Sequence, residues 1–221
     1  MTTEINSTKR KKVLWLTNIA TPYRIPAWQS VAKQVDLTMA LLSNTEQNRW
    51  WDFGKDEIGI PVQFLDVKAI RYGERSLYLP SKSLRKLLAQ DFDVFILGGW
   101  ESPAYLFALR VAKKRGIKTI SHYGSTDKSH GHSTGLIDRI RSWFYQSLDS
   151  HVSYGSDATE SLISMGVSKD RIHTGFNSVD HDYFHRLATE SRTTNIAQSG
   201  HNYIYSGQLI ARKNVSTDRK S

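Results

Sequence analysis

Three polar loops follow strands that we predict from short apolar runs, and they hold the residues best suited to chemistry. These loops are Ala20 to Arg24, Gly98 to Ser102 and His122 to Ser125. In an open parallel sheet the carboxyl ends of the strands share one edge, and ligands bind beyond that edge. We therefore expect the three loops to line one cleft.

His122 is the titratable group of most interest in this cleft, because it stands directly after the predicted strand over residues 117–121. An imidazole titrates near neutral pH and can form two directed hydrogen bonds, which suits proton transfer or the orientation of a hydroxyl group. The alternative is a histidine that is hydrogen-bonded inside its own loop. The sequence leaves both interpretations open.

Candidate binding residues stand in the other two loops. Arg24, which follows Tyr23, precedes a predicted helix and could hold a phosphate or a sugar hydroxyl, or pair with an acidic neighbour instead. Gly98 and Gly99 would let a ligand approach the backbone, although a tight turn also uses glycine. Trp100 could stack on a sugar ring or fill the core.

A phosphate-binding pattern is found near the carboxyl end, in Y-I-Y-S-G-Q-L-I-A-R-K-N-V over residues 203–215. A short apolar strand runs into a turn at Gly207, where the missing side chain lets a ligand approach the backbone. Lys213 adds a positive charge near the start of the next element, where phosphates bind well. A tight turn followed by solvated lysines is the alternative.

A metal site at Asp127, His130 and His132 is not expected. The two histidines lack the spacing of ligands on one helix face, and no fixed fourth ligand accompanies them. We therefore expect neither a metal ion nor a resident cofactor.

Apolar runs and helical stripes alternate up to about residue 185. Continuous apolar runs predict strands that are buried on both faces. The predicted strands cover residues 13–17, 37–42, 62–67, 94–97, 117–121, 151–154 and 171–174, and residues 70–79 form a loop. Helices are expected after Pro26, after caps at Ser81, Ser102 and Ser156, and over an apolar stripe from Leu136 to Phe144. This order predicts an α/β fold with a Rossmann-like, doubly wound parallel sheet.

The composition narrows the classes of partner. The 221 residues contain no cysteine, which excludes a disulfide framework and thiolate chemistry. The net charge of +9 fits a solvated basic surface, anionic lipid or phosphorylated substrates. We expect no nucleic-acid partner, since the basic residues are scattered and form no recognised motif. No signal peptide is evident, and no run reaches the ~20 apolar residues of a membrane-spanning helix.

The stretch over residues 203–215 resembles the start of the second domain in retaining, nucleotide-sugar-dependent glycosyltransferases of family four, the glycosyl transferases group 1 type. That domain opens with a strand followed by G-R-L-x-x-x-K-[GN], and Gly207, Leu209, Lys213 and Asn214 match the pattern. Gln208 stands where the family has an arginine.

Three further segments are similar to the family and occur in its order. T-P-Y-R-I-P at 21–26 resembles the first loop of one branch. Residues 156–167 end in L-x-x-x-G-V, and Asn177 to Asp180 resemble the N-G-V-D segment, with Ser178 in place of the glycine. The resemblance covers nearly the whole chain.

The resemblance implies the N-terminal half of a GT-B-type fold with a stub of the second domain. It divides the chain into a basic polar tail (1–12), a Rossmann-like acceptor-side domain (13–185), a linker (186–201) and the truncated start of a nucleotide-sugar-binding domain (202–221). The family's E-x7-E region is not found before Ser221. We therefore expect a truncated form with weak activity or none.

The implied activity is hexosyl transfer, with retention, from a nucleotide sugar to a glycan or lipid-linked acceptor. By resemblance, His122 is the catalytic residue that contacts the acceptor or the transferred sugar. Acceptor binding falls to Tyr23, Arg24, Gly99, Trp100, Gly124 and Ser125, and donor-diphosphate binding to Gly207 and Lys213. A cytoplasmic location is implied, with peripheral association at the inner face of an anionic membrane. The alternative is a non-catalytic module that binds glycan or anionic lipid together with a partner chain.

Overall fold

The computed structural model describes residues 9–45, 58–72, 75–126, 135–175 and 177–194. The predictions for Gly207, Lys213 and the group at Asp127, His130 and His132 lie outside these residues. The chain divides into one unit over Met1–Val179 and another over Asp180–Ser221.

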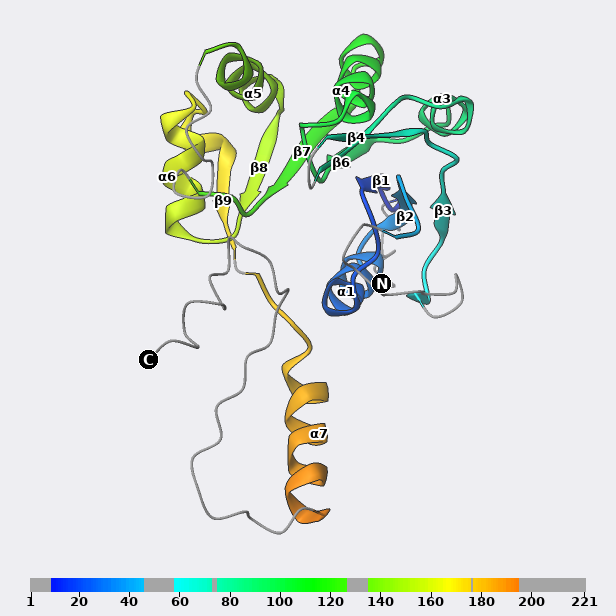
Figure 1. The fold of residues 1–221 in the computed structure, drawn as a ribbon, viewed down its shortest axis with the longest axis vertical. Coiled ribbons are helices and arrows are strands. Elements are labelled where there is room, and N and C mark those ends of the chain that lie inside the picture. The colour runs from blue at the N-terminus through cyan, green and yellow to red at the C-terminus, as the bar shows by residue number, and fades with distance from the viewer. Residues whose placement is uncertain (1–8, 46–57, 73–74, 127–134, 176, 195–221) are drawn as a thin grey trace, which may run out of the picture. The chain divides into compact units, whose positions relative to one another are not determined.

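A seven-stranded parallel sheet forms the first unit, in the order β3-β2-β1-β6-β7-β8-β9 (Figure 1). Its strands are β1 Lys12–Thr17, β2 Asp36–Leu41, β3 Val62–Phe64, β6 Val94–Leu97, β7 Lys118–Tyr123, β8 Ser150–Ser153 and β9 Ile172–Thr174. The strand order reverses beside β1, because β3 lies two places to one side and β6 lies on the other. This arrangement confirms the expected Rossmann-like, doubly wound α/β fold.

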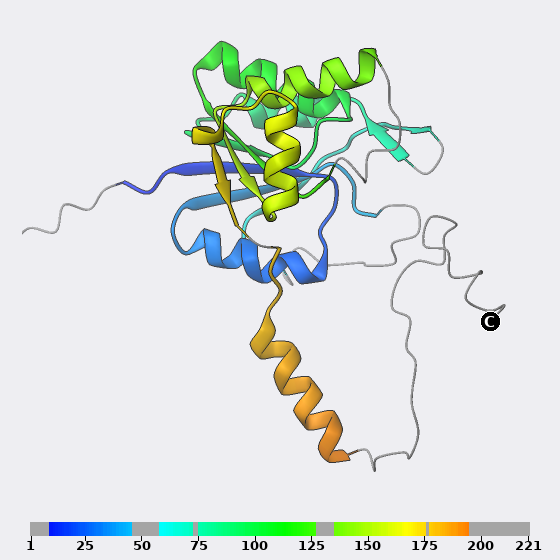
Figure 2. The same cartoon turned by 90° about the vertical axis from the view of Figure 1, so that its left-hand side faces the viewer.

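The helices divide unequally between the two faces of the sheet. Helix α1 Ile25–Ala32, which follows a short 3₁₀ turn at Pro22–Arg24, lies on one face (Figures 1 and 2). The opposite face carries α3 Lys82–Leu88, α4 Pro103–Arg115, α5 Leu136–Ser147 and α6 Ser156–Ser164. Right-handed crossovers produce this division, because the chain moves in opposite directions from β1 in its two halves.

Alternation along each strand sends neighbouring side chains into separate cores. Leu14 and Leu16 of β1 pack beneath the helix layer of α3 to α6, whereas Val13 and Trp15 point to the α1 face. The larger core contains the apolar faces of α4 and α6, and the smaller one centres on the fully buried Trp28 of α1. Because both faces of β1 are buried, its run of apolar residues shows no polar alternation.

Residues 70–79 form part of a hairpin rather than the loop expected from the sequence. Strand β4 Ala69–Tyr72 pairs antiparallel with β5 Arg75–Tyr78. Ser102 explains how the hairpin is attached: its Oγ accepts a hydrogen bond from the backbone N–H of Tyr78 at 3.1 Å. The sequence predicts that Ser102 caps α4. Its side chain makes no capping hydrogen bond to the helix, so this prediction is wrong.

The predicted cap at the start of α3 is confirmed, and a glycine ends α4. The Ser81 Oγ accepts from the backbone N–H of Leu84 at 3.1 Å, which caps the start of α3. Gly116 ends α4 with φ of 69°, a left-handed conformation that glycine adopts without strain. The strand β7 is longer than predicted, since it includes His122 and Tyr123.

In the second unit, α7 spans His181–Thr194. The Asp180 carboxylate accepts from the backbone N–H of Tyr183 at 2.9 Å and caps the start of this helix. Helix α7 thus occupies part of the segment expected to be a linker. No helix in the described ranges combines the length and apolar character needed to cross a bilayer.

Asp149 joins β7 to the end of α4. Its carboxylate accepts from the Thr119 backbone N–H at 2.9 Å and from the Thr119 hydroxyl at 2.6 Å, and pairs with Lys113 at 3.3 Å. Burial alone would raise the pKa of Asp149, but the Thr119 hydrogen bonds and the Lys113 charge outweigh burial and lower that pKa. The carboxylate is therefore ionised at neutral pH and links Thr119 of β7 to Lys113 of α4.

Asp149→Asn should lower the free energy of unfolding by about 1–3 kcal/mol, because charged hydrogen bonds to Thr119 are lost. Urea unfolding followed by circular dichroism measures this change. The matched control is Asp91→Asn, which removes only an exposed pair with Lys12 at 3.5 Å and should cost about 0.5 kcal/mol or less. Equal effects of the two substitutions would contradict the assignment.

Candidate functional site

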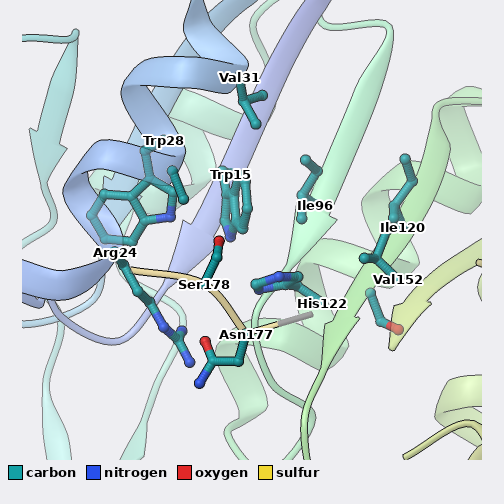
Figure 3. A pocket seen from close by; sticks show the side chains of 12 residues that line it. Trp15, Arg24, Trp28, Val31, Ile96, Ile120, His122, Val152, Asn177 and Ser178 are labelled. Carbon is teal, nitrogen blue, oxygen red and sulfur yellow. The ribbon is translucent and has the colours of Figure 1, made fainter. Parts of the chain in front are cut away.

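A pocket of about 240 Å³ lies on the α1 face of the sheet, lined by residues of α1 and of β1, β6, β7 and β8. Figure 3 shows the side chains that line it. They are Trp15, Arg24, Ala27, Trp28, Val31, Ile96, Ile120, Ser121, His122, Val152, Asn177 and Ser178. The lining holds one cationic side chain and no carboxylate.

Strand register builds the floor of the pocket. Trp15 of β1 lies opposite Ile96 of β6, and Ile96 lies opposite Ile120 of β7. Two residues further along β7, His122 lies opposite Val152 of β8. Alternation sends all five side chains to the same face, so an apolar row ends at a single imidazole at the carboxyl edge.

Tyr154 fixes the position of His122. The Tyr154 hydroxyl lies 2.9 Å from Nδ1 of His122, and the centroids of the two rings are 4.5 Å apart. The Trp15 ring meets the imidazole edge-on, at 5.2 Å between centroids. These contacts hold the ring in one orientation, with Nδ1 already engaged.

His122 is neutral near physiological pH. Burial lowers the pKa of His122 to about 4, and the charge of Arg24 adds to the effect. Burial also raises the pKa of the Tyr154 hydroxyl, so the tyrosine keeps its proton. If Tyr154 donates to Nδ1, Nε2 carries a proton and can donate; if Nδ1–H donates to Tyr154, Nε2 can accept. Either tautomer can orient a substrate hydroxyl.

Arg24 supplies the positive charge of the pocket. Its guanidinium carbon lies 5.9 Å from the ring centroids of both Tyr23 and Tyr154. Within the described part of the chain the guanidinium forms no hydrogen bond or ion pair, and the buried Nε has no partner. Contact with the faces of aromatic rings stabilises a guanidinium group and leaves its N–H donors available to an anion.

Asn177 and Ser178 complete the lining from the segment that follows β9. In Figure 3 the Asn177 amide and the Arg24 guanidinium point toward the same region, while Ser178 lies near Trp15. Both residues belong to the segment that resembles N-G-V-D, and the sequence predicts no role for them. The pocket gives them one, as polar groups at its rim.

Two predicted binding residues, Gly99 and Trp100, are not part of the pocket lining. A Cβ on Gly99 would stand 2.8 Å from Cε2 of Tyr105, so ring packing within the protein accounts for this glycine. Trp100 packs against the larger core, and the Arg141 guanidinium lies 6.0 Å from its ring centroid. Their roles as binding residues remain predictions.

The structure places the other candidates around His122. Tyr23 lies beneath Arg24 without lining the pocket. Gly124 follows β7, and a Cβ there would stand 2.2 Å from Cδ2 of Tyr154. The glycine therefore allows Tyr154 to reach His122. Ser125 is partly buried just beyond it and is not part of the lining.

A second histidine resembles His122 electrostatically but lies in the core. His151 is fully buried, with Nδ1 at 2.8 Å from the Ser121 hydroxyl and no partner on Nε2. Burial lowers the pKa of His151 to about 4, and the charge of Arg171 contributes. Within the described ranges no group of acidic, histidine or cysteine side chains is arranged to hold a metal ion.

Sequence reasoning missed Trp15, Trp28 and Tyr154 as residues of the site. Trp15 sits in an apolar run that reads as core, and only the strand register shows that it borders an opening. Tyr154 follows β8 directly, and His122 is the penultimate residue of β7. Alignment of adjacent strand ends was the signal that could have paired these two residues.

No protein-family model and no curated protein sequence matches the chain. Solved structures do match. UDP-N-acetylglucosamine 2-epimerase from Rickettsia bellii aligns with a TM-score of 0.52 and 16% identity, over 82% of this chain and 48% of that chain. The UDP-GlcNAc 2-epimerase from Neisseria meningitidis, bound to UDP-GlcNAc, aligns at 0.51 and 17%, over 83% and 50%.

Alr3699/HepE of Anabaena, in complex with UDP and glucose, aligns with a TM-score of 0.54 and 12% identity, over 84% of this chain and 51% of that chain. The chain therefore spans about half the length of the structures it matches. At these identities the likeness shows the fold, a Rossmann-like α/β unit of the kind found in GT-B-type enzymes.

Gly124→Ala should push the Tyr154 ring away from His122, because the new methyl group would overlap it. We expect the pKa of His122 to rise from about 4 toward its ordinary value of 6.5 as water reaches the ring. An NMR titration of the imidazole measures the shift. Gly175→Ala is the control, since its Cβ would stand at an ordinary 3.5 Å from Val152. An unchanged pKa in Gly124→Ala would contradict this packing.

The free energy of unfolding should fall as the pH drops from about 6.5 to about 4. Both histidines have folded-state pKa values below the ordinary 6.5, so the unfolded chain binds protons first over this window. Each should contribute a loss of about 1.4 kcal/mol per pH unit. Urea unfolding from pH 7.5 to 4.5 tests this expectation.

The same pH series on His122→Gln should show a shallower slope, and exposed His173→Gln should match the unaltered chain. The pKa values of Asp93, Asp149 and Asp170 are lowered in the folded protein. These carboxyl groups therefore change the free energy of unfolding only as the pH falls below their ordinary pKa of 3.8. A flat profile between pH 6.5 and 4.5 would show that the two imidazoles ionise freely in the folded protein.

Proposed function

We propose that the chain is the acceptor-side half of a nucleotide-sugar-dependent glycosyltransferase of family four. The reaction is hexosyl transfer, with retention, to a glycan or lipid-linked acceptor. The observation that carries the proposal is the neutral, oriented His122 beside the unpaired Arg24 at the carboxyl edge of the sheet. The fold shared with enzymes solved with UDP and UDP-GlcNAc supports it.

The geometry suits the handling of an acceptor hydroxyl. Because Tyr154 engages Nδ1 of His122, the free Nε2 is the atom left for a substrate hydroxyl. A neutral imidazole can accept a hydrogen bond from that hydroxyl while it attacks the sugar, whereas an imidazolium cannot. Arg24 adds a charge that steadies an anionic group of the substrate.

Donor binding falls to Gly207 and Lys213, beyond the described residues. In this proposal they hold the diphosphate of the nucleotide sugar, and Gln208 removes one cation of the usual pair. Transfer then occurs across a cleft between two domains, and positioning and charge stabilisation of the leaving group supply catalysis. The net charge of +9 fits work at the inner, anionic face of a membrane.

Sugar epimerisation is a second candidate, because two of the similar structures are UDP-N-acetylglucosamine 2-epimerases. Epimerisation of a carbon centre requires groups that remove and return a carbon-bound proton. The pocket lining contains no carboxylate, and its one imidazole is held at Nδ1. This composition favours acceptor binding. A non-catalytic module with a partner chain uses the same pocket without transfer.

His122→Gln should lower the rate of transfer by about 10²-fold or more, since a positioned acid–base group contributes about that factor. The assay incubates the chain, and a longer form with a complete second domain, with UDP-glucose or UDP-GlcNAc and a panel of glycan and lipid-linked acceptors. Labelled product and released UDP are measured together. His173→Gln, an exposed substitution on β9, should retain the full rate.

NMR of the same reactions separates the candidates. A glycosylated acceptor supports transfer, and an altered sugar in UDP-GlcNAc without acceptor supports epimerisation. Absence of transfer with both forms across the whole panel would overturn the proposal and leave the binding module as the better account.

A further inference from the structure

The pocket combines an apolar interior with a single positive charge at its rim. Trp15, Ile96, Ile120 and Val152 form the floor, and Trp28 of α1 forms a wall. The Arg24 guanidinium stands at one end near two tyrosine rings, without a hydrogen bond or ion pair to any described residue. Figure 3 shows this division, with the apolar side chains along the strands and Arg24 beside Asn177.

We propose that this pocket binds an amphipathic phosphate, in which a hydrocarbon chain lies over the floor and the phosphate contacts Arg24 and Asn177. The inference rests on the proposed function, because it commits the acceptor to the lipid-linked class rather than to a free glycan. The ligand we expect is a prenyl-type hydrocarbon chain that ends in a phosphate.

The floor argues for hydrocarbon. A sugar or a nucleobase brings several polar groups, and each one buried without a hydrogen bond is costly. Ile96, Ile120 and Val152 of the floor offer no such partner, and the indole N–H of Trp15 is the one polar group among the four floor side chains. Beside the floor, the Ser121 hydroxyl is already hydrogen-bonded to His151, which leaves the imidazole of His122. A hydrocarbon chain needs no partners and gains free energy from the apolar area it covers.

The size of the pocket agrees with this ligand. An apolar cavity of about 150 Å³ is enough to take up benzene, and this pocket measures about 240 Å³. It therefore accommodates a short branched hydrocarbon segment. The pocket is not enclosed, so a longer hydrocarbon chain can extend out of it.

The rim argues for an oxyanion. A guanidinium presents N–H groups in a planar fork that matches the oxygens of phosphate or carboxylate. No carboxylate of the protein occupies that fork within the described residues. The amide of Asn177, which points to the same region in Figure 3, can donate to a further phosphate oxygen. A phosphate has enough oxygens for both donors.

Calorimetric titration of the chain with geranyl phosphate tests the proposal without any sugar donor. We expect saturable binding, and binding at least about tenfold weaker for geraniol, which lacks the anion, and for inorganic phosphate, which lacks the chain. UMP serves as a phosphate with a polar, aromatic body and should also bind at least about tenfold more weakly.

Substitutions locate the site. Arg24→Gln should weaken geranyl phosphate by about tenfold or more, while Arg24→Lys, which keeps the charge, should retain much of the affinity. Ala27→Phe, which fills the pocket from α1, should abolish binding. Arg110→Gln, an exposed substitution on α4, should leave it unchanged. Circular dichroism and thermal unfolding confirm that each variant is folded before its affinity is compared.

Three results would overturn the inference: no saturable binding of geranyl phosphate, equal affinity for geraniol or UMP, or unchanged affinity in folded Arg24→Gln. Failure of the transfer assay has no bearing on this titration, because no donor is present. Conversely, efficient transfer to a free glycan with no effect of geranyl phosphate would support the transferase and reject the lipid-linked acceptor.

Discussion

The parallel pairing of β1, β6, β7 and β8 is the constraint on which the site depends. Parallel strands bring their carboxyl ends to one edge, and the register decides which side chains share a row. In this sheet the register places Ile96 between Trp15 and Ile120, and sets His122 opposite Val152. A shift of one residue in β7 would turn the His122 side chain away from Val152 and toward the larger core.

The unequal covering of the two faces follows from the same topology. Among the described residues, α3, α4, α5 and α6 lie on one face of the sheet, while α1 lies on the other. Apolar residues of β6, β7 and β8 consequently border an open pocket instead of a closed core. Burial against a ligand would recover hydrophobic free energy that the described residues do not supply. These incompletely buried apolar side chains are the reason to regard the opening as a binding site.

Much of the fold could be predicted because its signals are local. The apolar run of β1, the cap at Ser81 and the glycine that ends α4 each act within a few residues. The hairpin of β4 and β5 was missed, since Tyr78 is fixed by Ser102, a residue distant in sequence. The contact of Tyr154 with His122 likewise depends on strand register, which no local pattern determines.

Two histidines show why a shifted pKa alone does not identify a functional residue. Burial lowers the pKa of both His122 and His151 to about 4. His151 lies fully buried beside Ser121, so no substrate can reach it without unfolding. His122 borders a pocket, near the Arg24 guanidinium, which has no hydrogen bond or ion pair to a described residue. Access and an unpaired charge, rather than the depressed pKa, therefore distinguish the residue able to act on a substrate.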